Sequence, residues 1–131
     1  MKPILLVVAL TFISAAAIAQ TSLAGTNWRF VEVAGVAVPA DIRTNIEFEK
    51  DGVSGSSGCN TFFGDYAVAG SALSFKTMGW TKMFCGGPQM KFEIGIQTTL
   101  AATNTFQIVD RQLRFLAVDG SPLARLEQAP R

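Results

Sequence analysis

The chain has 131 residues, a length typical of one domain. Its formal charge is only +1, without a basic run, so we do not expect the electrostatic surface by which proteins hold nucleic acids or anionic membranes. It contains no histidine, which removes the commonest general base and the commonest metal ligand.

The N-terminal segment has the pattern of a secretory signal peptide. Lys2 is followed by an apolar run that extends to about Ala17. Ala17 and Ala19 place small residues at the two positions that a signal peptidase reads. We therefore expect residues 1–19 to be a signal peptide and cleavage to fall between Ala19 and Gln20.

A retained membrane anchor is the alternative for this segment. The apolar run is short for a bilayer span, however, and no basic stop-transfer cluster follows it. A lipid anchor would need a cysteine directly after the cut, where Gln20 stands. We expect residues 20–131 to be one exported domain, periplasmic or secreted, without a stable membrane anchor. Loss of Lys2 leaves it ten basic and ten acidic side chains.

The first half of the exported part predicts strands and hairpins. Apolar and polar residues alternate in LAGTNWRFVEV (23–33), where Trp28, Phe30 and Glu32 share one side, and again in TNIEFE (44–49). AGVAVPADI reads as a connection, Lys50-Asp51-Gly52 as a hairpin turn, and VSGSSG as a small-residue strand. GDYAVAGSALSF predicts a second hairpin that turns at residues 69–71.

The second half predicts one helix and more strands. Met78–Phe84 reads as irregular or extended, and a helix is expected from about Pro88 to Ala101. Its apolar face is formed by Met90, Ile94 and Ala101, widened by Phe92, Ile96 and Leu100. TFQIVD and LRFLAV predict a third hairpin, and LARLE a closing edge strand. The expected fold is α+β: a β-rich antiparallel sheet of about seven or eight strands, curved or barrel-like, with one packed helix.

Two cysteines, Cys59 and Cys85, lie in the expected exported part. In an oxidising compartment a lone pair is expected to form a disulfide. A zinc site needs about four ligands, typically with paired cysteines, and two isolated cysteines without histidine disfavour it. A cysteine nucleophile usually needs a histidine base and a redox pair needs C-x-x-C spacing, and the chain has neither. We therefore predict a structural bridge and neither a metal site nor a cofactor.

The stretch GSSGCNTFFGDY, residues 55–66, allows several interpretations. Its glycines, Gly55, Gly58 and Gly64, lie between strands, so tight backbone paths are favoured over a phosphate loop. Asn60 is expected to cap a turn by bonding nearby backbone, and a ligand amide is the alternative. Its three aromatics are expected to be core residues with one exposed, and a binding face is the alternative.

Paired carboxylates would be the chemistry of a glycosidase. The candidate pairs are Asp65 with Glu93 and Glu47 with Glu49. The second pair lies on a face that otherwise reads as solvated, and the N-terminal dipole of the predicted helix explains Glu93. Since no residues complete a nucleophile, base and stabiliser, we expect no enzyme.

Three blocks resemble the META domain family, which includes the bacterial heat-shock protein HslJ. They are LAGTNWRFVEVAG (23–35), VSGSSGCNTFFGDYAVAGSALSF (53–75) and TKMFCGGPQMKFEIGIQTTL (81–100). The GCN and TxMxC pair at this spacing is the discriminating part. The resemblance marks Trp28, Gly58, Cys59, Asn60, Gly64, Tyr66, Thr81, Met83, Cys85 and Glu93, which we interpret as scaffold residues.

The resemblance implies a small β-rich domain with one helix and no enzymatic activity. It also implies a link to heat and antibiotic stress, including novobiocin resistance, and to the cell envelope. The partner would be a protein or a small ligand, and the protein a monomer. A secreted inhibitor of a protease or other hydrolase, inserting a loop such as 35–43, is the alternative. Phe84 departs from the small residue common at that position and is expected to alter packing.

Overall fold

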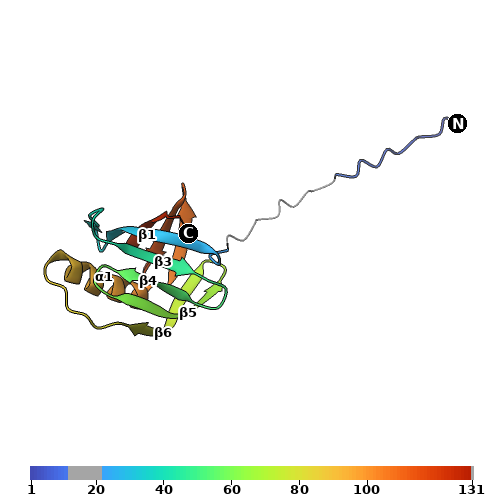
Figure 1. Ribbon diagram of the computed structural model, residues 1–131. Coiled ribbons are helices and arrows are strands. Elements are labelled where there is room, and N and C mark those ends of the chain that lie inside the picture. Colours follow the sequence, from blue (N-terminus) through green and yellow to red (C-terminus); the bar gives the residue numbers. More distant parts are fainter. Residues whose placement is uncertain (12–21, 131) are drawn as a thin grey trace.

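In the computed structural model, the described residues are 1–11 and 22–130, and they contain nine strands and one helix (Figure 1). The strands are β1 (Thr26–Val33), β2 (Val36–Ala37), β3 (Thr44–Phe48), β4 (Val53–Ser57), β5 (Thr61–Ala69), β6 (Ala72–Trp80), β7 (Thr105–Val109), β8 (Gln112–Leu116) and β9 (Pro122–Gln128). The helix is α1 (Pro88–Ala102).

Eight of the strands form a closed antiparallel barrel. Each strand from β3 to β9 pairs with the next, and β1 pairs with both β3 and β9. The ninth strand, β2, is a two-residue addition to the end of β1, in a segment where only a connection was expected. The structure therefore confirms the β-rich, barrel-like sheet with one helix.

The alternation of apolar and polar residues correctly predicts which early residues of β1 face inward. It fails at Val33, where a β-bulge changes the direction of the side chain. Trp28 and Phe30 of β1 are buried in the barrel, as their spacing predicts. The pairing of β1 with β9 shifts between Phe30 and Glu32, and the next buried residue is Val33. The bulge therefore turns Val33 inward, on the side where the alternation placed Glu32.

Two glycines allow chain segments to approach closely inside the barrel wall. A Cβ atom at Gly55 of β4 would lie 2.0 Å from the backbone oxygen of Asn45 on β3. A Cβ atom at Gly64 of β5 would lie 2.3 Å from the sulfur of Met78 on β6. The expected role of glycine in tight backbone paths is confirmed at both positions, because no larger residue fits without moving a neighbour.

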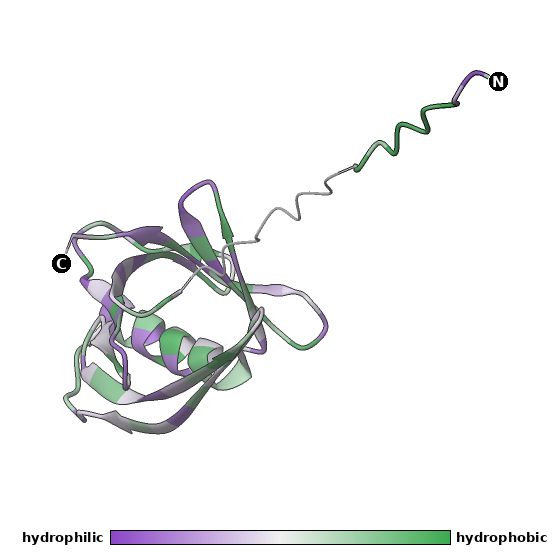
Figure 2. Ribbon diagram, turned by 90° about the vertical axis from the view of Figure 1, so that its right-hand side faces the viewer, coloured by the Kyte–Doolittle hydropathy of each residue, from purple (hydrophilic) through white to green (hydrophobic). Residues whose placement is uncertain are grey.

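The helix closes one end of the barrel, and Figure 2 shows it lying within the ring of strands. Phe92, Ile96 and Leu100 recur every four residues and are buried against the strands. Ile94 and Ala101 were expected on this face but are exposed. A Cβ atom on Gly95 would lie 3.0 Å from Cγ1 of Val33, so the helix lies close to the end of β1.

The pairing between β6 and β7 is the shortest in the barrel. These strands pair only at Ala72 and Thr105. From there β6 continues to Trp80, so Met78–Trp80 is strand and only the residues after it are irregular. Loop 81–87 and the helix then carry the chain to β7.

The start of the chain lies outside the barrel (Figure 1). Residues 1–11 are exposed and belong to neither a helix nor a strand. The predicted cleavage position between Ala19 and Gln20 lies outside the described residues. Within the described part, no helix combines the length and apolar character needed to cross a membrane.

Candidate functional site

The predicted disulfide joins the end of β4 to the loop before the helix. Cys59 and Cys85 are bonded, with their Cα atoms 5.7 Å apart. Cys59 belongs to a turn, residues 57–60, in which Gly58 has a φ of 104° and Ser57 donates its N–H to the oxygen of Asn60 over 2.9 Å. The bridge therefore attaches loop 81–87 to this turn.

Asn60 attaches the same loop a second time, through its side chain. Its Nδ2 donates to the backbone oxygen of Met83 over 3.1 Å, and the Met83 N–H donates to its Oδ1 over 2.7 Å. The Thr81 hydroxyl also donates to Oδ1, over 3.0 Å. The expectation that Asn60 bonds nearby backbone is wrong: its partners lie more than twenty residues further along the chain.

Thr81 extends the pairing of β5 and β6 into the loop. Its N–H donates to the oxygen of Thr61 over 3.0 Å, and its hydroxyl accepts the N–H of Thr61 over 3.1 Å. Together with Asn60 and the disulfide, these bonds fix the first five residues of the loop to the barrel.

Glu93 connects the helix to the turn at residues 57–60. Its side chain is completely buried, and it accepts hydrogen bonds from the Ser57 hydroxyl, from the Asn60 N–H over 3.2 Å and from Gln97 Nε2 over 3.2 Å. Neither ion pair in the described part of the chain includes it. A helix dipole is therefore an insufficient explanation of Glu93, because three hydrogen-bond donors hold its carboxyl group.

The other family-marked residues support the barrel away from this turn. Trp28 is buried and donates from its indole nitrogen to the Thr26 hydroxyl over 2.7 Å. The Tyr66 hydroxyl donates to the backbone oxygen of Glu49 over 2.7 Å, and its ring meets that of Phe48 edge-on. Burial, then the charges of Asp51 and Glu49, raises the pKa of Tyr66 above its ordinary value.

The aromatics of the GSSGCNTFFGDY stretch divide as expected. Phe62 is buried, with its ring centre 4.9 Å from that of Trp80, and Tyr66 is partly buried. Phe63 is the exposed one, and its ring lies over Gly79 of β6 on the outer face of the barrel.

The carboxylate pair proposed for a hydrolase, Asp65 with Glu93, does not share an accessible face. Asp65 is exposed on β5, opposite Lys76 of β6, whereas Glu93 is shut off from solvent and bonded to protein donors. Among residues 1–11 and 22–130, no three Asp, Glu, Cys or His side chains gather where they could hold a metal ion.

Loop 81–87 is attached on one side and apolar on the other. Met83 is 61% exposed and Phe84 is 87% exposed. The expectation that Phe84 alters the packing is therefore wrong, because its side chain points away from the core. Its position next to a bridged cysteine was the only sequence signal that the surrounding backbone is fixed.

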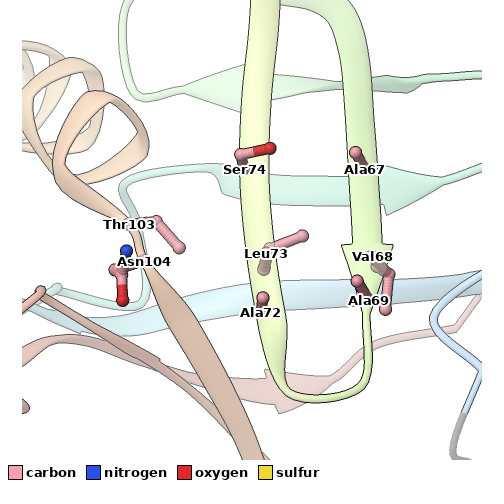
Figure 3. Close-up of a pocket in the computed structure, with 8 residues that line it drawn as sticks. All are labelled: Ala67, Val68, Ala69, Ala72, Leu73, Ser74, Thr103 and Asn104. Carbon is pink, nitrogen blue, oxygen red and sulfur yellow. The ribbon is translucent and has the colours of Figure 1, made fainter.

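An open pocket of about 230 Å³ lies at the far end of the β5–β6 hairpin, beside the start of β7 (Figure 3). It is lined by Ala67, Val68, Ala69, Ala72, Leu73, Ser74, Thr103 and Asn104. No acidic, basic or thiol side chain lines it, and its polar side chains are those of Ser74, Thr103 and Asn104.

Solved structures share this fold. An NMR structure of a protein from Burkholderia xenovorans is 25% identical, with a TM-score of 0.70 over 83% of this chain and 85% of that one. A second NMR structure is 24% identical, with a TM-score of 0.64 over 79% and 89% of the two chains. A crystal structure of a DUF4847 family protein from Bacteroides vulgatus is 14% identical, with a TM-score of 0.60 over 83% and 96%.

A search of curated proteins finds no match. The family comparison is specific, however, because the model of the META domain matches residues 21–130 and so spans the whole barrel, the disulfide and the helix. This chain belongs to the META domain family.

Proposed function

We propose that the protein is an exported, non-enzymatic binding domain that acts in cell-envelope stress, including heat and novobiocin-type antibiotic stress. Membership of the META domain family suggests a stress-related or envelope-associated role. The observation that carries the binding role is Phe84, an aromatic side chain 87% exposed on a loop that a disulfide and Asn60 attach to the barrel. Large exposed apolar side chains on a fixed frame favour recognition.

Two further observations support this proposal. The side chain of Asn60 donates to the Met83 oxygen, and the carboxyl group of Glu93 accepts the Asn60 N–H and Gln97 Nε2. These two polar side chains therefore serve as structural supports of the loop. The bridge between Cys59 and Cys85 is compatible with an oxidising, exported location.

Deletion and complementation test the proposed function. A strain lacking the protein is expected to lose viability under heat or novobiocin, and the native chain is expected to restore it. Phe84→Ser should fail to restore growth. Val118→Ser should succeed, since Val118 is equally exposed, at 85%, but lies on the β8–β9 turn, outside loop 81–87 and the helix. A deletion strain that grows normally under several envelope stresses would refute the proposal.

Inhibition of a protease or other hydrolase is the second candidate, and the loop 35–43 favours it. Pro39, Ala40 and Asp41 are exposed at its tip. Nη2 of Arg29 donates to the oxygens of Val38 and Pro39, over 3.4 and 3.2 Å. A braced, exposed loop suits insertion into a substrate cleft. Capture of a hydrolase from periplasmic extract, lost when Ala40 is replaced by Glu, would support this function over the first.

A further inference from the structure

We propose that the Phe84 face docks reversibly on the anionic headgroup surface of a lipid bilayer. We define the Phe84 face as Lys82, Met83 and Phe84 of loop 81–87 with Lys91 and Ile94 of α1. This inference rests on the proposed binding function and names its partner. It concerns surface docking, and therefore differs from the anchor that the N-terminal segment would provide.

The apolar part of the face is unusually open. Phe84 is 87%, Met83 61% and Ile94 59% exposed. Lys91 and Ile94 are three positions apart on the helix, so they share a side of it. The connection from β6 to α1 runs along the outside of the barrel (Figure 1). A projecting aromatic residue beside lysines is typical of side chains that enter the headgroup region of a membrane.

The charge of the face is positive, although the near-neutral charge of the whole chain predicts no surface for anionic membranes. No aspartate or glutamate lies between Asp65 and Glu93 in the sequence. Lys76 is opposite Asp65 across the β5–β6 pair, whereas Lys82 directly precedes Met83 and Lys91 lies three positions before Ile94, and both lysines are exposed. Glu93 is completely buried and does not contribute an exposed carboxylate. An anionic surface therefore complements this face.

The backbone beneath the face is fixed before any contact forms. The disulfide, the Asn60 pairing with Met83 and the Thr81–Thr61 bonds all attach loop 81–87 to the barrel. Docking therefore costs little ordering of the loop. The face offers only two lysines to the headgroups, and only Met83 and Phe84 of the loop can enter them. The expected binding is therefore weak and strongly salt-dependent.

Vesicle flotation tests the proposal with the chain from Gln20 onward. Every helix and strand of the described residues lies within 26–128, so this chain retains the complete barrel. The apolar residues 4–10 must be absent because they would bind lipid themselves. The probes are vesicles of phosphatidylcholine alone and vesicles with 30% phosphatidylglycerol, at low and physiological salt.

We expect binding to the anionic vesicles only. Lys82→Glu reverses one charge and should weaken binding at least about five-fold, and Phe84→Ser should weaken it about ten-fold. The matched controls, Val118→Ser and Lys50→Glu, change an equally apolar and an equally charged exposed residue elsewhere and should bind normally. Quenching by brominated lipid of the indole in Phe84→Trp should locate this position in the headgroup region.

Absence of binding, equal binding to both vesicle types, or equal binding by Phe84→Ser and the native chain would overturn the inference. The growth experiment separates this from the proposed function. Failure of Phe84→Ser to complement, without vesicle binding, would support a protein partner and overturn only the lipid inference. Vesicle binding without a deletion phenotype would support the lipid inference and refute the stress function.

Discussion

Asn60 and Met83 pair as two residues of neighbouring strands do, but one of the two partners is a side chain. The amide of Asn60 accepts the Met83 N–H over 2.7 Å and donates to the Met83 oxygen over 3.1 Å. The buried amide therefore completes the hydrogen bonding of a loop that has left the sheet. The amide side chain carries its donor and its acceptor on two atoms of one planar group, as the pairing requires.

Replacing Asn60 with Asp tests this pairing. The shape is kept, but the Nδ2 donor is lost and a carboxylate oxygen faces the Met83 carbonyl oxygen. We expect the free energy of unfolding to fall by about 2–3 kcal/mol, because a buried acceptor loses its partner. Urea denaturation measures the change. Asn104→Asp, at an exposed position, should alter it by at most about 0.5 kcal/mol. Similar losses for both variants would contradict the proposed role.

The disulfide is expected to stabilise the fold without determining it. For a sequence separation of 26 residues, reduction should lower the free energy of unfolding by about 3–4 kcal/mol in the chain-entropy model. Far-UV circular dichroism of the reduced protein should remain native, since Asn60 and Thr81 still attach the loop. Thiol titration of the denatured, unreduced protein should find no free thiol, and two reactive thiols would refute the bridge.

Glu93→Gln should destabilise the link between helix and turn. The donors of Ser57, Asn60 and Gln97 now bond to a carboxyl group, and a neutral amide in its place offers one acceptor oxygen and weaker hydrogen bonds. We expect a loss of about 1–3 kcal/mol, measured by thermal or urea unfolding. Glu127→Gln, on an exposed part of β9, is the matched control and should be nearly silent. A stabilised Glu93→Gln variant would show that the donor assignment is wrong.

Tyr66 is the only tyrosine, so its titration is directly visible in ultraviolet absorbance. Burial, then Asp51 and Glu49, raises its pKa above the ordinary 10.0. Above pH 10.0 the folded state therefore retains a proton that the unfolded state releases. Stability should fall as pH rises from that value through the higher folded pKa. Asp51→Asn should bring the folded pKa closer to 10.0, and an unchanged pKa would exclude the Asp51 contribution.

Much of the barrel follows from local sequence pattern. The hairpin at Asp51-Gly52, the turn at residues 69–71 and the helix from Pro88 appear where period and turn residues place them. The helix ends one residue later than expected, at Ala102. Local pattern fails at Val33 and Ile94, because a bulge rotates the first and the barrel mouth selects a different helix face for the second.

The candidate site was less predictable because its interactions are distant in sequence. Cysteine counting located the bridge between Cys59 and Cys85. The same register could have suggested the Asn60 pairing, since Asn60 directly follows one cysteine and Met83 precedes the other by two residues. Nothing local distinguishes a buried Glu93 from a solvated one. The exposure of Phe84 also depends on which side of the loop the bridge occupies.

The pairing of β1 with β9 makes the fold depend on the whole chain at once. Trp28 in the first strand of the barrel lies opposite Gln128 in the last, so the barrel closes only when both strands are present. A chain still emerging from the ribosome lacks that final strand and has two open sheet edges. Folding must therefore follow synthesis of nearly the entire sequence, which places this domain among slowly assembling, long-range topologies.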